Sequence, residues 1–219
     1  MRTLAVLRPE PGNAATVARI ITAGHQALAL PLFAVRALAW TPPDPAAHDA
    51  LILTSANTLR HGGAGLGALC ALPVLAVGEA TAAAARKAGF TVLLTGERNA
   101  AHLLTLAAGQ GITRALHLGG RERTMPDSDI VTASIAVYAS EALPIAPEQV
   151  AQLDDSVALL HSARAARRLA ALASDRSTIR IAALSPAVRD AAGPGWPAVT
   201  VAATPDDTSL IAAAIALAD

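Results

Sequence analysis

The sequence has very few of the residues that form disulfides, thiolate metal sites or lysine-based catalysts. Cys70 is the only cysteine, which excludes a disulfide within the chain and a cysteine-built metal site; a small apolar filler is the better interpretation of it. Lys87 is the only lysine and lies in a polar helical stretch. Schiff-base chemistry and a Walker-type phosphate lysine are therefore set aside as well.

An excess of charge of one sign and a long bulky apolar run are also missing. Acidic and basic residues balance at 17 each, and no basic run stands out, so we expect no nucleic-acid partner. The chain is 53% hydrophobic with a mean hydropathy of +0.43, but alanine is the main source. With no spanning segment and too short an apolar run at residues 1–8 for a secretory signal, we expect a soluble, cytoplasmic protein without a membrane partner.

The six histidines and the glycine-rich patch do not form a catalytic motif. No HExxH or paired metal spacing occurs, and no GxSxG nucleophile elbow exists, so the sequence predicts neither a metal site nor a serine hydrolase. His117 and His161 fall late in predicted strands, where a hydrogen-bonded packing role is expected. Residues 62–67 contain fragments of a dinucleotide fingerprint, but they follow a helix, so we interpret them as a loop.

The chain is organised around residues 49–57, where the apolar run Leu51–Leu53 is followed by Thr54, Ser55 and Asn57. This pattern predicts a buried parallel strand followed by a helix with a polar first turn. Residues 155–164 repeat the pattern, and the same offset of 107 positions relates three further pairs: Val74 and Ile181, Gly78 and Ser185, and Leu103 and Leu210. A constant offset over several elements indicates an internal duplication.

Predicted strands and helices alternate along the whole chain. Strands are expected at 3–7, 27–30, 51–53, 74–77, 91–94, 115–118, 135–138, 157–160, 179–184 and 199–202, with a turn at 8–13 in which Asn13 caps a helix ended by Gly24. The pattern predicts an α/β fold of two doubly wound, flavodoxin-like parallel-sheet domains. One domain comprises residues 1–34 plus 145–219 and the other residues 35–144, joined by a two-stranded linker with a cleft between them.

Small or polar turns follow most of the predicted strands. They are Arg8-Pro9, residues 54–57, 78–81, 119–123 and 162–164, and Ser185-Pro186. Ligands of open parallel sheets bind at the carboxyl ends of the strands, and helix N-termini there offer N–H groups to anions. Each hydroxyl taken alone is interpreted as an N-cap, but several such turns around one cleft predict a ligand with many negative groups.

Tyr138 is the only tyrosine and ends the strand that leaves the second domain. A packing role with an exposed hydroxyl is the ordinary interpretation. In the predicted arrangement it would also face the cleft.

With these motifs in their order, the chain resembles the uroporphyrinogen-III synthase family. The matching features are Arg8-Pro9, Gly24-His25 before Leu30-Pro31, Thr54-Ser-Ala-Asn57, Ala76-Val-Gly-Glu-Ala-Thr81, Gly89, the 119–123 turn, Val137-Tyr138 and the Ser162 turn. The resemblance implies a cofactor-free, monomeric lyase of haem biosynthesis that closes the linear tetrapyrrole hydroxymethylbilane to uroporphyrinogen III with ring D inverted. The substrate carries acetate and propionate groups on every ring, which agrees with the polyanion prediction.

The resemblance also implies roles for individual residues. Tyr138 matches the family's candidate for the acid that assists departure of the hydroxyl group. The expected substrate-binding residues are Arg8, Thr54, Ser55, Ala56, Asn57, Gly78, Thr81, Gly120, Arg121, Arg123, Ser162, Ala163 and Ser185. A transient handover of substrate from hydroxymethylbilane synthase is a further expectation.

Two turns depart from the family pattern. The family's Gly-Pro-Thr-Thr is Ser185-Pro-Ala-Val188 here, and its Ser-Pro-Ser is Ser162-Ala-Arg164. These changes remove side-chain hydroxyls but keep backbone donors. They leave a second hypothesis open, a non-catalytic two-domain binding protein for a tetrapyrrole or another polyanion.

Overall fold

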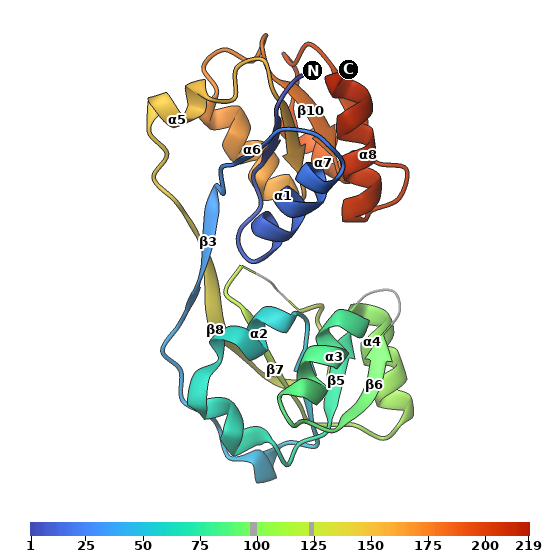
Figure 1. The fold of residues 1–219 in the computed structure, drawn as a ribbon. Coiled ribbons are helices and arrows are strands. Elements are labelled where there is room, and N and C mark those ends of the chain that lie inside the picture. The colour runs from blue at the N-terminus through green and yellow to red at the C-terminus, as the bar shows by residue number, and fades with distance from the viewer. Residues whose placement is uncertain (97–99, 123–124) are drawn as a thin grey trace. The chain divides into compact units, whose positions relative to one another are not determined.

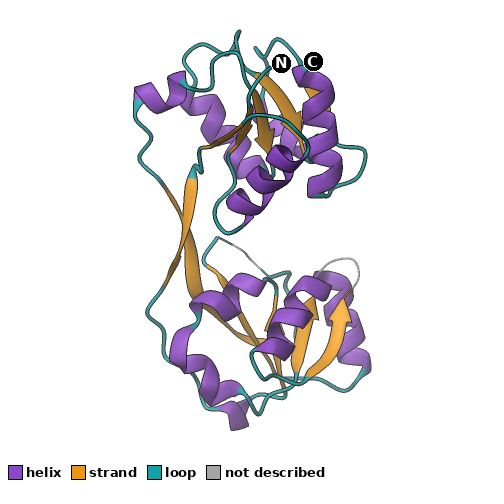
Figure 2. Ribbon diagram, viewed as in Figure 1, coloured by secondary structure: helices purple, strands orange, loops and turns teal. Residues whose placement is uncertain are grey.

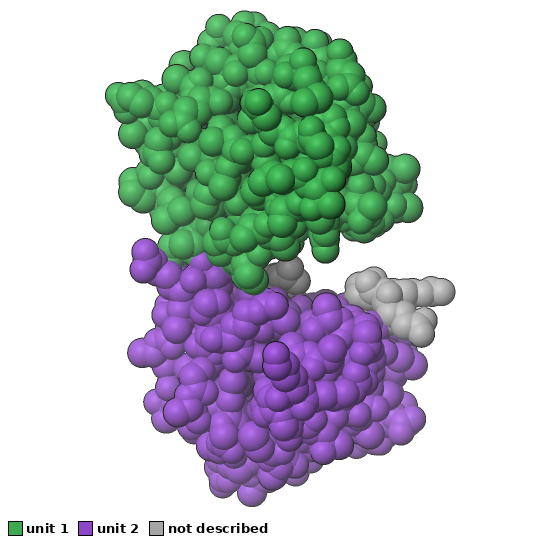
Figure 3. Space-filling model, viewed as in Figure 1, with its two compact units in different colours: residues 1–34, 141–219 green, residues 35–140 purple. Residues whose placement is uncertain are grey.

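The computed structural model describes residues 1–96, 100–122 and 125–219 (Figure 1). The chain forms two compact units, one of residues 1–34 and 141–219 and the other of residues 35–140 (Figure 3). Each unit is an α/β structure with a largely parallel sheet, as the alternating pattern predicted.

Unit 1 contains a five-stranded parallel sheet in the order β11-β10-β9-β1-β2. Its strands are β1 (Leu4–Val6), β2 (Ala27–Ala29), β9 (Val157–Leu160), β10 (Arg180–Ala183) and β11 (Val199–Val201). Counted along this unit, the order is the flavodoxin-like 2-1-3-4-5. Its topological switch point lies between β1 and β9, where the chain turns from building one side of the sheet to building the other.

Helices cover both faces of this sheet (Figures 1 and 2). They are α1 (Gly12–Thr22), α5 (Pro147–Ala151), α6 (Ala163–Leu172), α7 (Pro186–Ala192) and α8 (Asp207–Ala218). Leu4 and Val6 pack with α1 and α8, whereas Ala5 and Leu7 pack with α6 and α7. Because successive strand residues point to opposite faces, a strand buried on both faces has to be apolar throughout, as residues 4–7 are.

Unit 2 contains a six-stranded sheet in the order β3-β8-β7-β4-β5-β6. Its strands are β3 (Phe33–Ala37), β4 (Ala50–Leu53), β5 (Val74–Val77), β6 (Val92–Gly96), β7 (Ala115–Gly120) and β8 (Val131–Ala142). The helices α2 (Ala56–His61) and α3 (Glu79–Lys87) cover one face and α4 (Ala100–Gly109) the other. The unit boundaries at 34/35 and 140/141 fall within the paired strands β3 and β8.

The strand register confirms the duplication that the 107-residue offset predicted. Leu51 pairs with Val74 in unit 2, and Ala158 pairs with Ile181 in unit 1. The spatial order β6-β5-β4-β7-β8 also matches β11-β10-β9-β1-β2 strand for strand. The two units are therefore circularly permuted versions of one arrangement, with the switch point of unit 2 between β4 and β7.

Several local predictions are wrong. Asn13 does not cap α1: Pro11 is the N-cap, and Asn13 is buried inside the helix, with Nδ2 donating to the carbonyl oxygens of Val6 and Arg8. The loop expected at 62–67 is instead part of a 3₁₀ helix, η2 (Gly63–Leu69), whose Leu66 and Leu69 fill the core. Strand β7 continues through Gly120, and β8 is twelve residues long, because pairing with neighbouring strands extends segments that look irregular in the sequence.

None of the helices in the described part of the chain combines the length and the apolar character needed to span a bilayer.

Candidate functional site

Most of the expected site residues lie at or just beyond the carboxyl ends of the parallel strands of their own unit. In unit 1, Arg8 follows β1, Ser162 follows β9 and Ser185 follows β10. In unit 2, Thr54 follows β4, Gly78 follows β5 and Gly120 ends β7. Parallel strands end at one edge of a sheet, so each unit collects its own set of polar turns at the edge where ligands of such folds bind.

Three of the serine hydroxyl groups act as helix N-caps. Ser55 Oγ accepts a hydrogen bond from Asn57 N at 3.2 Å, Ser162 Oγ from Ala165 N at 3.2 Å and Ser185 Oγ from Val188 N at 3.4 Å. A helix N-terminus has four amides without a helical acceptor, so each cap occupies only one of them. These turns can offer a ligand backbone N–H groups and the positive end of a helix dipole more readily than hydroxyl groups.

Ala56, Asn57 and Ala163 lie in the first turns of these capped helices. Ala56 and Ala163 are the first residues of α2 and α6, and they carry no polar side chain, so only their amides can serve a ligand. The side chain of Asn57 accepts a hydrogen bond from Arg60 Nη1 at 2.8 Å.

The turn after β5 is shaped by Gly78. Its φ of +88° lies in the region that favours glycine, and it precedes the nine-residue helix α3. Thr81 is buried in the first turn of that helix, and its amide donates to the Gly78 carbonyl oxygen. A shallow pocket of about 420 Å³ opens beside this turn, lined by Gly78, Glu79, Thr95 and Gly96.

Thr54 differs from the capping residues because its hydroxyl group contacts a buried histidine. His117, in β7, is 1% exposed and lies between two hydroxyl groups. Its Nε2 is 3.4 Å from Thr54 Oγ1, and its Nδ1 is 2.7 Å from Ser134 Oγ on β8. Burial lowers the pKa of His117 to about 4, so the ring is neutral at physiological pH.

The two glycines that end β7 leave room for two different side chains. A Cβ atom on Gly119 would lie 2.6 Å from His117 Nε2, and one on Gly120 would lie 2.6 Å from Tyr138 Cε2. Tyr138 lies within β8, four residues before its end, and is 5% exposed. Its ring packs into the α2 and α3 side of the core and lies 6.1 Å from the His61 ring, centre to centre.

The turn after β7 begins one residue after Gly120, not at Gly119 as the sequence suggested, because both glycines belong to the strand. Arg121 donates its amide to the Tyr138 carbonyl oxygen at 2.9 Å, and its half-exposed side chain forms an ion pair with Glu122. Arg123 lies outside the described residues. Arg121 is thus anchored through its backbone amide, while its side chain pairs with the neighbouring Glu122.

Arg8 belongs to a charged cluster that the sequence did not predict. Asp207, in the first turn of α8, accepts hydrogen bonds from Arg8 Nη1 at 3.3 Å, Arg19 Nη1 at 2.5 Å, Thr16 Oγ1 at 2.9 Å and His161 Nε2 at 2.7 Å. The Arg8 guanidinium lies over Gly12, where a Cβ atom would come within 2.4 Å of Arg8 Nε. The cluster lies at the switch point of unit 1, between the ends of β1 and β9.

The electrostatics of this cluster keep Asp207 ionised. Burial alone would raise the pKa of Asp207, but hydrogen bonds from His161, Thr16 and Arg19 outweigh it, and the pKa lies below its usual value. The pKa of His161 is lowered by burial, against the opposing effect of Asp207. The Arg8 and Arg19 guanidinium groups of this cluster are the kind of group that pairs with an anionic ligand.

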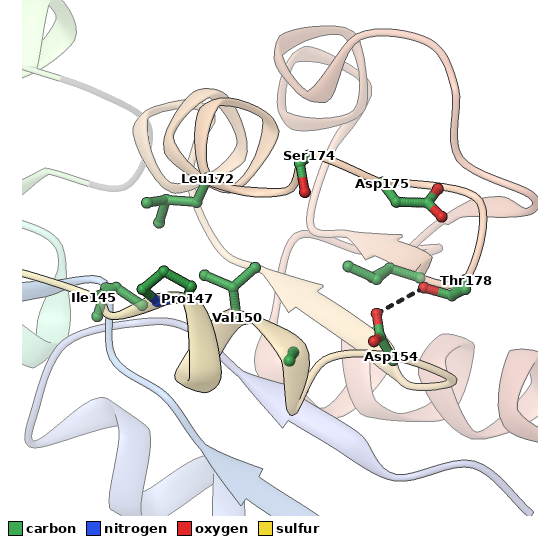
Figure 4. A pocket seen from close by; sticks show the side chains of 10 residues that line it. Ile145, Pro147, Val150, Asp154, Leu172, Ser174, Asp175 and Thr178 are labelled. Atoms are coloured by element: carbon green, nitrogen blue, oxygen red, sulfur yellow. Dashed lines mark hydrogen bonds between the residues drawn. The ribbon is translucent and has the colours of Figure 1, made fainter.

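A pocket elsewhere in unit 1 contains none of the expected site residues. It measures about 450 Å³ and is lined by side chains that include Val150, Leu172, Asp154 and Asp175. Figure 4 shows the Asp154 carboxylate accepting a hydrogen bond from the Thr178 hydroxyl group, at 2.9 Å. These residues precede β9, or lie at the end of α6 and between α6 and β10, so the pocket lies at the amino-terminal edge of the sheet, away from the polar turns.

Sequence reasoning missed Asp207, Thr16, Arg19 and Ser134, and it assigned His117 and His161 only to packing. Both histidines do form hydrogen bonds, as expected. The switch-point rule could have directed attention to residues after β1 and β9, but nothing in the sequence pairs Asp207 with Arg8 across 199 positions. Among the described residues, no three His, Cys, Asp or Glu side chains come together as a metal site would require.

The fold and these turns define an α/β protein with two parallel sheets, each of which presents amides, hydroxyl groups or arginines at its carboxyl edge. This is a protein class suited to a small ligand with several negative groups. A family model described as uroporphyrinogen-III synthase HemD matches residues 14–212. The chain belongs to the uroporphyrinogen-III synthase family.

Solved structures share this fold. Uroporphyrinogen-III synthetase from Helicobacter pylori 26695 is 17% identical with a TM-score of 0.70, and the match covers 99% of this chain and 100% of that one. A mutant uroporphyrinogen III synthase from the extremely thermophilic bacterium Thermus thermophilus is 16% identical with a TM-score of 0.58, covering 100% and 98%. No curated protein sequence matches the chain at a significant level.

Proposed function

We propose that this chain cyclises hydroxymethylbilane to uroporphyrinogen III with inversion of ring D, a step of haem biosynthesis. The observation that carries the proposal is the family match, which spans all strands of both sheets except β1. The polar carboxyl edges of the two sheets agree with it independently, because the substrate is a polycarboxylate.

Substrate binding is the first task that the site performs in this proposal. The carboxylates of the substrate are held by backbone amides in the first turns of α2, α3 and α6 and by the guanidinium groups of Arg8 and Arg121. The Ser55 and Ser162 caps support this arrangement because they fix the first turns of α2 and α6. Holding one conformation of a reactive linear chain can lower a barrier by roughly 7–11 kcal/mol in well-oriented cases.

Tyr138 is the proposed acid that assists departure of the hydroxyl group. General acid assistance of this kind contributes about 10²–10⁴-fold. Contact with the Gly120 backbone keeps the ring in one place: the phenolic oxygen would lie only 3.0 Å from a Cβ at that position.

A non-catalytic binding protein for a tetrapyrrole or another polyanion is the second candidate. The altered turn Ser185-Pro-Ala-Val188 favours it, because Pro186 has no N–H group and Ser185 is occupied as the N-cap of α7. The turn at Ser185 can therefore offer a ligand fewer hydrogen-bond donors than the capped turn of α2.

The deciding experiment is to generate hydroxymethylbilane in situ with a purified hydroxymethylbilane synthase and to determine the uroporphyrin isomers after oxidation. Isomer III as the main product supports the synthase. Isomer I at the proportion of the control without this chain contradicts it, and tight binding of the tetrapyrrole in the same preparation would then support the second candidate.

We also propose that the protein acts as a cytoplasmic monomer and receives its substrate by transient handover from hydroxymethylbilane synthase. The lability of the linear tetrapyrrole, which closes without the enzyme to isomer I, supports a handover. Sedimentation velocity of each protein alone and mixed tests both the monomeric state and the handover.

A further inference from the structure

The buried histidine of unit 2 occupies a position that packing alone does not account for. His117 is paired in register with Ile52 on β4 and with Ser134 on β8. Ile52 belongs to the apolar cluster beneath α4. An apolar residue would fill this place at no polar cost, whereas a buried imidazole needs partners for both nitrogens.

Both partners are hydroxyl groups, but they lie in different places on the sheet. Ser134 is an exposed residue on β8, whereas Thr54 stands at the carboxyl edge of the sheet, where a ligand is expected. The imidazole therefore links a surface hydroxyl group to one at the expected binding edge. In the internal duplication, position 54 corresponds to position 161, and His161 is a member of the charged cluster of unit 1.

The two distances indicate which nitrogen carries the proton. The separation of 2.7 Å between Ser134 Oγ and His117 Nδ1 is typical of an O–H donor and short for an N–H donor. The separation of 3.4 Å between His117 Nε2 and Thr54 Oγ1 suits a weak N–H donor. Since a neutral imidazole carries one proton, Ser134 donates to Nδ1 and the proton lies on Nε2.

This tautomer decides what Thr54 can do for a ligand. If Nε2 donates to Thr54 Oγ1, the hydroxyl hydrogen of Thr54 is left to point toward a ligand. With the proton on Nδ1, Thr54 would donate to Nε2 and present only lone pairs, which a carboxylate repels. Hydrogen bonds to a charged group contribute more than neutral ones, so the difference matters for a polycarboxylate.

We propose that His117 is a positioning residue for the substrate: Ser134 holds its neutral ring in the Nε2–H tautomer, and this ring keeps the Thr54 hydroxyl group as a donor for a substrate carboxylate. No net proton moves in this arrangement. The carboxylate assignment rests on the proposed function, whereas the tautomer is a property of the protein alone.

The first test reads the tautomer directly. The ¹⁵N chemical shifts of His117, assigned with a His117→Gln variant, should show the Nε2–H form in the wild-type chain and a loss of this preference in Ser134→Ala. A ring that carries its proton on Nδ1 in the wild-type chain overturns the inference, whatever the activity of the protein.

The second test is a double-mutant cycle on KM for hydroxymethylbilane. Ser134→Ala should raise KM about three- to tenfold, the range expected for one hydrogen bond, with less effect on kcat, because the group acts in binding. In a Thr54→Val background the same change should have no further effect. A Ser134→Ala change that raises KM by the same factor in the wild-type and Thr54→Val backgrounds would contradict a relay through His117. An unchanged KM in Ser134→Ala would contradict it as well.

Thr132→Val is the matched control. Thr132 is an exposed hydroxyl residue on the same strand, and it contacts His48 and the Ala115 carbonyl oxygen instead of His117. Its loss should leave KM unchanged. Failure of the inference and of the proposed function remain distinguishable, since the isomer produced by the wild-type chain decides the function and the tautomer decides the relay.

Discussion

The burial of a neutral His117 should make the protein unstable toward acid, and the structure sets the size of the effect. The side chain is 1% exposed and its pKa is lowered from 6.5 to about 4. Between these two values the unfolded chain binds a proton that the folded chain excludes, so the free energy of unfolding must fall as the pH falls.

The magnitude follows from the two pKa values. Each pKa unit corresponds to about 1.36 kcal/mol, so the full loss reaches about 3 kcal/mol below pH 4 and about 2 kcal/mol at pH 5. Above pH 7 His117 is neutral in both the folded and the unfolded chain, so its effect on the free energy of unfolding no longer depends on pH. His61 and His161 also have lowered pKa values, and these add to the slope of the wild-type protein in the same direction.

His117→Gln isolates the contribution of this residue. The variant removes the titrating group and leaves His61 and His161 in place. We expect the variant to be less stable at pH 7.5, but to lose about 2 kcal/mol less than the wild-type protein between pH 7.5 and pH 5. Urea unfolding followed by circular dichroism at several pH values measures this difference, and parallel pH profiles for the two proteins would refute the reasoning.

Three further predictions concern the neighbouring groups. Gly120→Ala should lower the free energy of unfolding by about 1–3 kcal/mol, because the new methyl group overlaps the buried ring of Tyr138; a fully retained melting temperature would show that the ring can move away. Tyr138→Phe should lower kcat about 10²-fold or more while leaving urea unfolding nearly unchanged, and unaltered isomer III formation would remove the acid role. Asp207→Asn should cost about 1–3 kcal/mol at pH 7 through the hydrogen bonds it loses. Because the pKa of Asp207 is lowered in the folded state, this difference should shrink as acid protonates the wild-type carboxylate, and a difference that persists in acid would mean that charge is not its source.

More of the fold than of the candidate site could be predicted from the sequence. Apolar runs such as residues 51–53 and 157–160 become buried parallel strands because a strand covered on both faces tolerates few polar residues. The constant offset of 107 residues predicted two related sheets, and the register of Leu51 with Val74 and Ala158 with Ile181 confirms it. The capping role of Ser55 could also be predicted, because a serine that precedes a helix accepts a hydrogen bond from a backbone N–H group in the first turn of that helix.

The errors arose where contacts are not local. Asn13 looks like a cap, but its side chain satisfies the carbonyl oxygens of Val6 and Arg8 at the end of β1 and lies inside the helix. The glycines at 119 and 120 look like a turn, yet they belong to β7, whose pairing with β8 continues through Gly120. The side chains of His117 and Tyr138 occupy the space that a Cβ atom at these positions would need. A glycine in a strand often marks such a close approach, and the sequence does not say what approaches.

The sequence by itself determined the α/β class, the duplicated pattern, the family and the polar character of the turns, because these depend on local periodicity and on the order of short motifs. Only the tertiary structure decided which groups meet. It joined Asp207 to Arg8 across the switch point of one sheet and placed His117 between Ser134 and Thr54 in the other. The physical reason is that strand order and register bring together residues that are distant in the chain, and a buried polar group is then held by whichever partner the sheet places beside it.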